Sequence, residues 1–449
     1  MIQNVSTIGL GKLGAPLAAC LASKGLHVVA VDVDEKKVDA VNSGRAPVHE
    51  PGLEEMIEEN RPRLKATTSI AEAIAATGVT FIVVPTPSAP DGEFSLEYAL
   101  TACAEIGKAL AEKDGYHLVV MTSTVMPGST GGPILDALQK HSGKKAGFDF
   151  GLCYSPEFIA LGSVIRDFLH PDFLLIGESD PRAGQLLADL YLEVVDGEPP
   201  VARMTFVNAE LAKLAVNTFV TTKISFANML ARICEKLPGG DVDSITSAIG
   251  LDSRIGRRYL TGAVAYGGPC FPRDNLALRA LARSVGAPFD IAEATDSFNR
   301  GQIVSLANMV AKHLGGAGTV AILGLSYKPD TDVVEEATGS LLAAELLKGG
   351  HRVVAFDPAG GRNASARLGA GLELAESADA CVRAGDVVVV ATPWSEFRGI
   401  DVETWRSANG NPRVVVDCWR MLAGLRTEPG IHYIALGTGA YESAAPEGA

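Results

Sequence analysis

The stretch STIGLGKLGAPLAAC, residues 6–20, places three glycines between an apolar run and a helix-like segment. The apolar run ends at Ile8, a helix is expected over residues 15–25, and a second apolar run, HVVAVDVD, follows over residues 27–34. Glycines in the order GxGxxG, set between a strand and a helix in this way, are typical of a dinucleotide-binding β-α-β unit. The sequence therefore predicts a Rossmann-type domain here.

Each glycine of this turn has a separate physical role. Gly9 permits the tight turn, Gly11 lets the backbone approach a pyrophosphate, and Gly14 lets the helix pack close to the strand. The N-terminus of the helix offers amide groups and a partial positive charge to the phosphates. The turn therefore predicts where a dinucleotide binds.

An acidic residue, Asp32, stands about 20 residues after the glycines, at the end of the second apolar run. Its carboxylate is expected to accept hydrogen bonds from the ribose hydroxyls of the cofactor and to repel a 2′-phosphate. This favours NAD over NADP, although the neighbouring Lys36 and Lys37 leave NADP open.

Two more apolar runs end in polar turns, VTFIVVPTPSAPDG over residues 79–92 and HLVVMTSTVMPGST over residues 117–130. Continuous apolar runs are typical of parallel strands that are covered on both faces. Ligands meet the carboxyl ends of such strands, where Thr86, Ser123 and Thr124 stand. These three residues are candidate ligand contacts, with ordinary turn residues as the alternative.

The C-terminal third repeats this order of elements. TVAILGLSYK over residues 319–328 is followed by a helix-like segment and then by the apolar run in HRVVAFDPAG, residues 351–360. Because the first turn, GLSYKPDTD, lacks the glycine fingerprint, a nucleotide other than the first cofactor is the expected ligand. Lys328 in that turn is a candidate phosphate partner, with a solvated surface lysine as the alternative.

A long apolar-periodic segment, residues 208–240, separates the two α/β patterns. It has helical spacing and no internal glycine or proline before Pro238, so it predicts a helix of about 30 residues. Lys213 and Asn217 are four residues apart and share a face of that helix. A helix of this length at such a position commonly spans domains or forms a subunit interface.

Composition excludes some classes of protein. The 449 residues, of which 47% are hydrophobic, carry a net charge of −14, which argues against a general affinity for nucleic acid or anionic membranes. No segment reaches the roughly 18 uncharged apolar residues of a membrane span, and the N-terminal residues resemble no export signal. Seven scattered cysteines without a CxxC pair suggest free thiols in a reducing cytoplasm, and no metal site is predicted.

One of those cysteines has unusual neighbours. Cys270 lies in AYGGPCFPRDNLAL, residues 265–278, after two glycines and between two prolines. Gly267 and Gly268 are expected to leave room for a ligand to approach the backbone, while the prolines stiffen the bend. Arg273 supplies a cation three residues on. These features are compatible with a reactive thiol, with an inert buried cysteine in a turn as the alternative.

Taken together, the motifs resemble the UDP-glucose/GDP-mannose dehydrogenase family, NAD-dependent enzymes that oxidise the C6 alcohol of a nucleotide sugar to a carboxylate. The resemblance implies two Rossmann-like doubly wound parallel-sheet α/β domains joined by a long central helix. It implies an NAD-binding domain over residues 1–200, a central helical domain with a homodimer interface over 201–305, and a domain for the nucleotide sugar, a UDP-sugar, over 306–449. The motifs that carry the resemblance are GLGKLGAPLA, HEPGLEEMI, STVMPGST, SPEFIALGSVIRDFLHPDFLLIG, AELAKLAVNTFVTTKISFANML, DSRIGRRYL, YGGPCFPRDNLAL and GLSYKPDTD.

The resemblance also implies a mechanism. Lys213, Asn217 and Asp274 match groups that surround the reacting carbon, where an ammonium and an amide stabilise charge on the C6 oxygen. Cys270 would attack the aldehyde formed by the first oxidation, and the thiohemiacetal would be oxidised to a thioester. Glu157 matches a carboxylate that activates the hydrolytic water.

Further positions carry implied binding roles. Thr124 is expected to hold the same water as Glu157, and Phe158 and Leu260 are expected to lie against the substrate. The positions implied at the cofactor are Gly9, Gly11, Leu13, Gly14, Asp32, Lys37, Thr86, Thr124 and Arg273. The positions implied at the substrate are Glu157, Phe158, Lys213, Asn217, Tyr259, Leu260, Gly267 and Lys328.

The chain departs from the family pattern at a few positions. Many members carry a second carboxylate where this chain has Leu161, and an arginine where it has Glu335. A general-base role therefore cannot be transferred to residue 161, and a phosphate contact cannot be transferred to residue 335. Arg273 stands for a usual lysine and Pro269 for a usual serine, which alters local hydrogen bonding.

The strings CFPRD and KISFANML are closer to the UDP-glucose pattern than to that of the N-acetylmannosamine enzymes. UDP-glucose is therefore the favoured substrate, and UDP-N-acetylhexosamines and GDP-mannose are alternatives. A β-hydroxyacid dehydrogenase is a rival from another class, but it has no use for a second α/β unit or for Cys270. A nucleotide-sugar-binding protein without turnover is a second rival, against which the retained polar residues argue.

Overall fold

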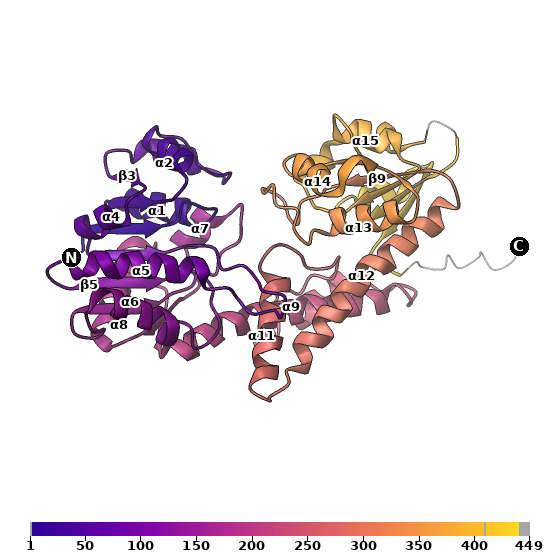
Figure 1. Cartoon of the computed structure of the whole chain (residues 1–449). Helices are drawn as coiled ribbons and strands as arrows, with labels where there is room; N and C mark the ends of the chain where they lie inside the picture. Colours follow the sequence, from indigo (N-terminus) through magenta and orange to yellow (C-terminus); the bar gives the residue numbers. More distant parts are fainter. Residues whose placement is uncertain (1, 408–409, 440–449) are drawn as a thin grey trace, which may run out of the picture. The chain divides into compact units, whose positions relative to one another are not determined.

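The computed structural model describes residues 2–407 and 410–439. The chain divides into two compact units (Figure 1). The first unit comprises Met1–Val216 and Ala280–Ala287, and the second comprises Asn217–Arg279 and Pro288–Ala449. Each unit is built around one sheet, which confirms the predicted pair of α/β domains.

The first sheet has eight strands in the order β3-β2-β1-β4-β5-β6-β7-β8. β6 and β7 pair antiparallel, and the other neighbouring strands pair parallel. The order changes direction at β1, which places the crevice for a ligand at the carboxyl ends of β1 and β4. The strands are β1 Asn4–Ile8, β2 His27–Val31, β3 Leu64–Thr67, β4 Val79–Ile82, β5 His117–Met121, β6 Phe150–Tyr154, β7 Leu174–Glu178 and β8 Val201–Met204.

Helices cover both faces of this sheet, so its strands are apolar on both sides. Phe81 of β4 belongs to the core under α1, α3, α7 and α8, and the next residue, Ile82, belongs to the core under α4, α5 and α6. The Phe81 ring lies 6.1 Å from the Tyr191 ring of α8. The helices are α1 Gly14–Ser23, α2 Glu35–Asn42, α3 Leu53–Glu59, α4 Ile70–Ala76, α5 Glu97–Ala111, α6 Leu135–Ser142, α7 Val164–Leu169 and α8 Pro181–Val194.

The second sheet has six strands in the order β11-β10-β9-β12-β13-β14, and its neighbours pair parallel. Its strands are β9 Thr319–Leu323, β10 Arg352–Phe356, β11 Leu372–Leu374, β12 Val387–Val390, β13 Arg413–Asp417 and β14 Ile431–Ala435. Its covering helices are α13 Thr338–Lys348, α14 Gly361–Leu368, α15 Ala378–Ala384 and α16 Val402–Trp405.

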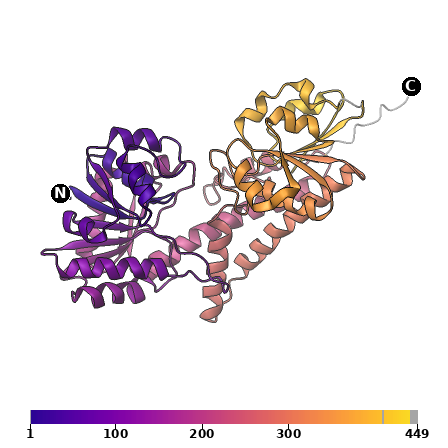
Figure 2. The same ribbon diagram turned by 45° about the horizontal axis from the view of Figure 1, so that its top comes forward.

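The predicted long helix is confirmed as α9, Phe206–Cys234, 29 residues that begin in the first unit and end in the second (Figure 2). Lys213 and Asn217 are one turn apart on it. The remaining helices of the central part of the chain are α10 Val242–Ile249, α11 Phe271–Ser284 and α12 Asp290–Leu314.

The turn after β9 retains two of the three glycine roles of the turn after β1. Gly9 has φ +111° and Gly324 has φ +97°, a region that favours glycine. A Cβ atom at Gly14 would lie 2.0 Å from the Gly9 oxygen, and one at Gly339 would lie 1.9 Å from the Gly324 oxygen. The second unit therefore keeps the tight turn and the close helix, although a longer loop separates its two glycines in sequence.

Ser326 occupies the place of the middle glycine, and this turn is closed by the carboxylate of Asp357. Asp357 accepts hydrogen bonds from Ser326 N at 2.9 Å, Ser326 Oγ at 2.6 Å and Trp394 Nε1 at 3.2 Å. It also accepts from the amides of Leu325, Ala359 and Gly360. Because six donors already surround this carboxylate, it holds the turn itself and is not available for a ribose as Asp32 is expected to be.

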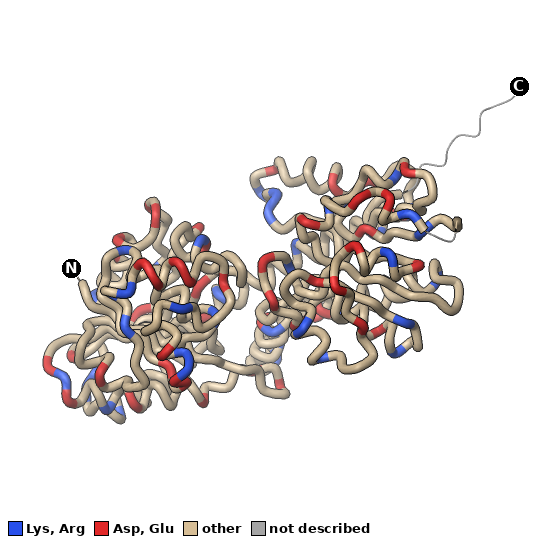
Figure 3. The backbone as a smooth tube through the Cα atoms, turned by 90° about the horizontal axis from the view of Figure 1, so that it is seen from above, with Lys and Arg blue, Asp and Glu red and all other residues tan. Residues whose placement is uncertain are grey.

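Figure 3 shows acidic and basic residues interspersed along both units. Among the helices of the described residues, none combines the length and the hydropathy that crossing a bilayer requires. In the same part of the chain, no group of three or more His, Cys, Asp or Glu side chains is arranged to hold a metal ion.

Candidate active site

The glycine turn after β1 has the shape that a dinucleotide requires. A Cβ atom at Gly9 would lie 2.3 Å from the Val83 oxygen, and the Gly14 position is equally closed. At Gly11, by contrast, no heavy atom of the described residues lies within 4 Å of an added Cβ atom beyond the residue's own chain neighbours. Two glycines are thus required by the fold, and the third leaves open space in front of α1. Leu13, half-buried, precedes the first residue of that helix.

Asp32 links the end of β2 to the glycine turn. Its carboxylate accepts hydrogen bonds from Leu10 N at 2.7 Å and from Asp34 N at 2.9 Å. Lys37 of α2 lies at 3.2 Å from the same carboxylate. Asp32 is 9% exposed, so the aspartate is fixed at the place where a ribose is expected, with Lys37 beside it.

The loops after β4 and β5 are joined at their predicted cofactor contacts. Thr86 Oγ1 donates to the main-chain oxygen of Thr124 at 2.7 Å, and Ser123 Oγ donates to the main-chain oxygen of Val84 at 2.6 Å. The three polar residues that follow these strands therefore lie together at the carboxyl edge of the sheet, as the sequence predicts.

Glu157 and Lys213 are brought together in the first unit. Lys213, 7% exposed, donates from Nζ to the main-chain oxygen of Glu157 at 2.6 Å. Its Nζ atom also lies 4.5 Å from the centroid of the Phe158 ring, which is tilted against the Phe173 ring with centroids 4.8 Å apart. Burial raises the pKa of Glu157 to about 7, against the opposing effect of the Lys213 charge. The carboxylate is thus balanced between its two protonation states near neutral pH.

Two carboxylates that the sequence analysis did not single out hold the loops of this region. Glu210 of α9, fully buried, accepts from Gly128 N at 2.6 Å and from Thr130 N at 2.7 Å. Glu50 accepts from Gly162 N at 2.8 Å and from Val164 N at 2.7 Å. No pattern in the sequence around either residue distinguishes it from neighbouring polar residues.

The loop that Glu50 holds follows Glu157 and contains Leu161, which is half-buried. Position 161, where the resemblance implies a second carboxylate, therefore bears an apolar side chain on an anchored loop.

In the second unit, Asn217 donates from Nδ2 to the carboxylate of Asp274 at 2.6 Å. Asp274 is fully buried and also lies 3.3 Å from Nε of Arg273. Two predicted catalytic residues are therefore paired. The carboxylate of Asp274 orients the amide of Asn217 through this hydrogen bond.

Cys270 is exposed, whereas the six other cysteines are buried. The sequence suggested a stiffened bend, and the structure shows that Cys270 immediately precedes α11, with its main-chain oxygen accepting from Asp274 N at 2.8 Å. The amides at the N-terminus of a 14-residue helix favour negative charge on a nearby thiolate.

Gly267 and Gly268 make room for a protein loop, where sequence reasoning expected room for a ligand. A Cβ atom at Gly267 would lie 2.1 Å from the Glu336 oxygen, and one at Gly268 would lie 2.8 Å from the Tyr327 ring. Gly268, with φ +82°, also donates to the Glu335 oxygen at 3.0 Å. The bend before Cys270 is therefore packed against the loop that carries Lys328, which is half-buried.

The other predicted substrate contacts lie before this bend. Tyr259 has φ +63°, is 50% exposed, and presents its ring edge-on to Phe271 at 6.4 Å. Leu260 is 2% exposed, and its main-chain oxygen accepts from Arg257. Tyr259 offers a side chain to a ligand, whereas Leu260 is part of the core.

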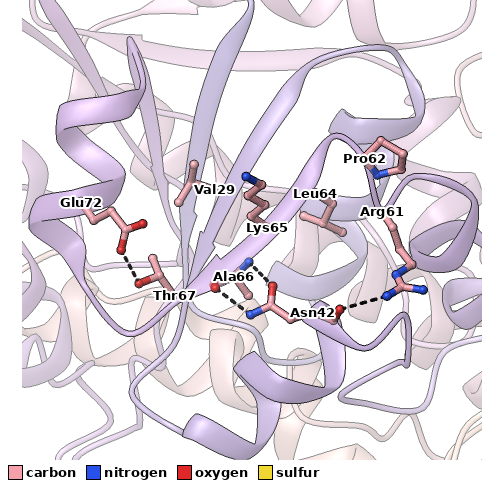
Figure 4. Close-up of a pocket in the computed structure, with 9 residues that line it drawn as sticks. All are labelled: Val29, Asn42, Arg61, Pro62, Leu64, Lys65, Ala66, Thr67 and Glu72. Carbon is pink, nitrogen blue, oxygen red and sulfur yellow. Dashed lines mark hydrogen bonds between the residues drawn. The ribbon is translucent and has the colours of Figure 1, made fainter.

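A cavity of about 560 Å³ lies against β3 in the first unit, and its lining contains no predicted site residue (Figure 4). Asn42 pairs with the edge strand there, accepting from Ala66 N at 2.8 Å and donating to Ala66 O at 2.9 Å. This pairing satisfies backbone groups at the edge of the sheet that another strand could otherwise bind. The sequence analysis predicts no role for the cavity. The described residues that line it are Val29, Asn42, Arg61, Pro62, Leu64, Lys65, Ala66, Thr67 and Glu72.

Comparison with known families covers most of the chain. Residues 3–195 match the NAD binding domain of the UDP-glucose/GDP-mannose dehydrogenase family, residues 207–301 match its central domain, and residues 321–424 match its UDP binding domain.

Individual relatives agree with this match. UDP-glucose 6-dehydrogenase AglM of Haloferax volcanii is 40% identical over 405 residues, which cover 89% of this chain and 94% of that protein. GDP-mannose 6-dehydrogenase of Azotobacter vinelandii is 36% identical over 361 residues, which cover 79% and 81%. The structure of a UDP-glucose dehydrogenase from Pyrobaculum islandicum superposes with a TM-score of 0.89 at 36% identity and covers 98% of both chains.

Proposed function

Because this chain belongs to the UDP-glucose/GDP-mannose dehydrogenase family, we propose that it uses NAD to oxidise the C6 alcohol of UDP-glucose to the carboxylate. The observation that carries the proposal is the exposed Cys270 at the N-terminus of α11, four residues before Asp274, which holds Asn217. A family member that released an aldehyde or a ketone would have no use for a nucleophile in this position.

The residues of the first unit fit NAD. The open space at Gly11 and the N-terminal amides of α1 would receive the pyrophosphate, and Asp32 would receive the ribose hydroxyls. Thr86 and Thr124 would lie near the nicotinamide end of the cofactor. When bound, NAD accepts one hydride in each of the two oxidations.

The first oxidation, from alcohol to aldehyde, is assisted by Lys213, Asn217 and Asp274. The Nζ of Lys213 and the second hydrogen of the Asn217 amide stabilise negative charge on the C6 oxygen as the hydride leaves, a kind of contact that contributes on the order of 3 kcal/mol. Asp274 acts through Asn217, because its carboxylate already takes the other hydrogen of that amide at 2.6 Å. Asp274 is therefore the residue that orients the amide in this step.

Cys270 captures the aldehyde, so the reactive intermediate does not leave. The thiolate attacks C6 to form a thiohemiacetal, which loses a second hydride and becomes a thioester. Water then attacks the thioester, the acid is released and the thiol is restored. Four electrons leave the sugar in two hydrides, and one oxygen atom of the carboxylate comes from water.

Glu157 is the base for the hydrolysis, with Thr124 holding the same water. Leu161 leaves the neighbouring position without a carboxylate, so the role falls to Glu157. A base with a pKa of about 7 is partly deprotonated at neutral pH and is still strong enough to accept a proton from water.

Three domains divide this work in the proposal. Residues 1–200 bind NAD, residues 201–305 carry the nucleophile, and residues 306–449 bind the UDP part of the substrate, with Lys328 near its phosphates. The boundaries of the three matched family domains support this division. The free cysteines suit a reducing compartment, and we place the enzyme in the cytoplasm.

Incubation with NAD and a panel of nucleotide sugars tests the substrate. We expect UDP-glucose to give the highest kcat/KM for NADH formation, ahead of GDP-mannose and UDP-N-acetylglucosamine. A preference of tenfold or more for either alternative would overturn the assignment of the sugar and leave the family chemistry standing.

We further propose that the enzyme is a homodimer through α9. Apolar side chains spaced by seven residues stand exposed from the middle of this helix to its C-terminal end, with Phe219 at 67%, Phe226 at 49% and Ile233 at 54%. Met229 is also exposed and lies three residues after Phe226 on the same helix. Large apolar side chains exposed along one side of a helix are typical of a subunit interface. In a symmetric dimer, the same side of α9 in a second copy of the chain would pack against them.

The variant Phe226→Asp is expected to be monomeric at micromolar concentration in sedimentation velocity, because a carboxylate would be buried without a partner in the interface. Phe148→Asp is the matched control, since Phe148 is 72% exposed in the first unit, and this variant should sediment like the wild type. Equal sedimentation of both variants as dimers would place the interface elsewhere.

A further inference from the structure

Residues 263–266, which we call the lead-in segment, connect the Tyr259 region to Gly267 and so to Cys270. The segment lies in neither a helix nor a strand of the described residues, yet all four of its residues are buried. Buried backbone amides and carbonyls need partners, since each unpaired group costs about 1–3 kcal/mol. The partners that the segment finds are side chains.

Two asparagines from two helices pair with the backbone of the lead-in segment. Asn228 of α9 accepts from Ala263 N at 2.7 Å and donates to Val264 O at 2.8 Å. Asn299 of α12 accepts from Tyr266 N at 2.8 Å and donates to Tyr266 O at 2.9 Å. A primary amide has the same donor and acceptor as a peptide group, so each asparagine pairs with one N–H and one C=O group of the segment.

Further contacts fix the end of the segment that is nearer to Cys270. Thr338 Oγ1 donates to Ala265 O at 3.1 Å, and Asn275 Nδ2 lies 3.0 Å from the Tyr266 hydroxyl. The Tyr266 ring stands edge-on to Phe271, the first residue of α11, with centroids 6.3 Å apart. Tyr266 is thus held through its amide, its carbonyl, its ring and its hydroxyl.

The burial of these amides makes their pairing specific. Asn228 is 1% exposed and Asn299 is 7% exposed, so water does not substitute easily for either side chain. Loss of one amide leaves two backbone groups of the segment unpaired in the interior, and the chain is then free to shift. Because Cys270 stands four residues after Tyr266, such a shift moves the nucleophile.

We propose that Asn228 and Asn299 are positioning residues that hold Cys270 at one place throughout the reaction. The inference rests on the proposed function, in which one sulfur atom must meet C6 as an aldehyde, as a thiohemiacetal and as a thioester. A displacement of about 1 Å can cost on the order of 10²-fold in rate, so a nucleophile that serves three steps needs a rigid base.

The test compares Asn299→Ala and Asn228→Ala with Thr404→Ala. Thr404 is a buried polar residue of the same unit whose hydroxyl contacts Asp379 and Arg383, remote from Cys270 in the sequence. We expect each asparagine variant to lower kcat by about 10- to 100-fold, to change KM for NAD by less than about threefold, and to release aldehyde that semicarbazide traps. Thr404→Ala should have a lower melting temperature than the wild type but an unchanged kcat and no release of aldehyde.

A second readout needs no sugar. Alkylation of Cys270 by iodoacetamide, followed by mass spectrometry of the intact protein, should be severalfold slower in both variants because the thiolate is no longer held where the N-terminal amides of α11 stabilise its charge. Normal alkylation together with a loss of kcat no larger than that of Thr404→Ala would overturn the positioning role.

The alkylation rate does not depend on turnover, so it tests the positioning role even if the wild type oxidises none of the nucleotide sugars. Failure of the positioning role and failure of the proposed function therefore remain distinguishable. If Asn299→Ala does not fold, Asn299→Asp takes its place. That variant keeps the acceptor for Tyr266 N and loses the donor to Tyr266 O, and it should also slow alkylation.

Discussion

Replacing Cys270 with alanine is expected to reduce formation of the acid by at least about 10³-fold, because the variant lacks the thiol that holds the aldehyde as a covalent adduct. Binding of NAD and of the UDP-sugar should remain, since the hydrogen bond between Cys270 O and Asp274 N involves only the main chain and an alanine keeps it. Product analysis by mass spectrometry and isothermal titration with each nucleotide measure the two effects separately.

Cys234→Ala is the matched control for that variant. Cys234 is a buried thiol of the same unit that packs beside Ala231 and Val242, so its loss removes a cysteine without touching the bend before α11. The control should form the acid at nearly the wild-type rate. Acid production by Cys270→Ala at the rate of this control would refute the covalent role.

Glu157→Gln is expected to let the thioester accumulate on Cys270. A glutamine has the shape of the glutamate but cannot take a proton from water, so hydrolysis should slow by about 10²- to 10⁴-fold while both oxidations continue. Intact-protein mass spectrometry after mixing with NAD and UDP-glucose should show the added mass of a UDP-glucuronyl group on Cys270. NADH should appear in a burst.

The raised pKa of Glu157 adds a pH dependence with a definite sign. The active form is the deprotonated carboxylate, and with a pKa of about 7 it makes up about a tenth of the molecules at pH 6 and about nine tenths at pH 8. Hydrolysis in the wild type should therefore rise by about tenfold across this range, and in Glu157→Gln it should stay flat.

Glu178→Gln is the control for both effects, because it removes another carboxylate of the first unit, one that pairs with Arg203 at 2.7 Å. It should show neither the adduct nor the flattened pH profile. Absence of an adduct in Glu157→Gln at an unchanged rate would mean that another group activates the water.

Local patterns in the sequence predict those parts of the structure that depend on neighbours along the chain. The glycine turn forms where predicted because the close backbone approach at Gly9 and Gly14 depends on residues that are near in the sequence. The helix α9 forms where predicted because its apolar residues recur with helical spacing along one continuous segment. The family resemblance implied only that Asn217 and Asp274 both lie near the reacting carbon, and their hydrogen bond was not predicted, since 57 residues separate them.

The parts that sequence reasoning missed depend on contacts between distant segments. Glu50 reaches a loop 112 residues away, and Glu210 reaches one 82 residues away. Gly267 and Gly268 looked like room for a ligand because nothing in their own segment shows the loop around Tyr327 that fills the space. The glycine roles in the second unit were hidden because Gly324 and Gly339 are separated by a longer loop than their counterparts.

Counting the electrons removed from each sugar tests the proposed four-electron oxidation most directly. A limiting amount of UDP-glucose, incubated with excess NAD in water enriched in ¹⁸O, should yield two NADH per sugar and UDP-glucuronate that carries one ¹⁸O atom in its carboxylate. One NADH per sugar, with a product that ends as an aldehyde or a ketone, would contradict the capture of the intermediate by Cys270.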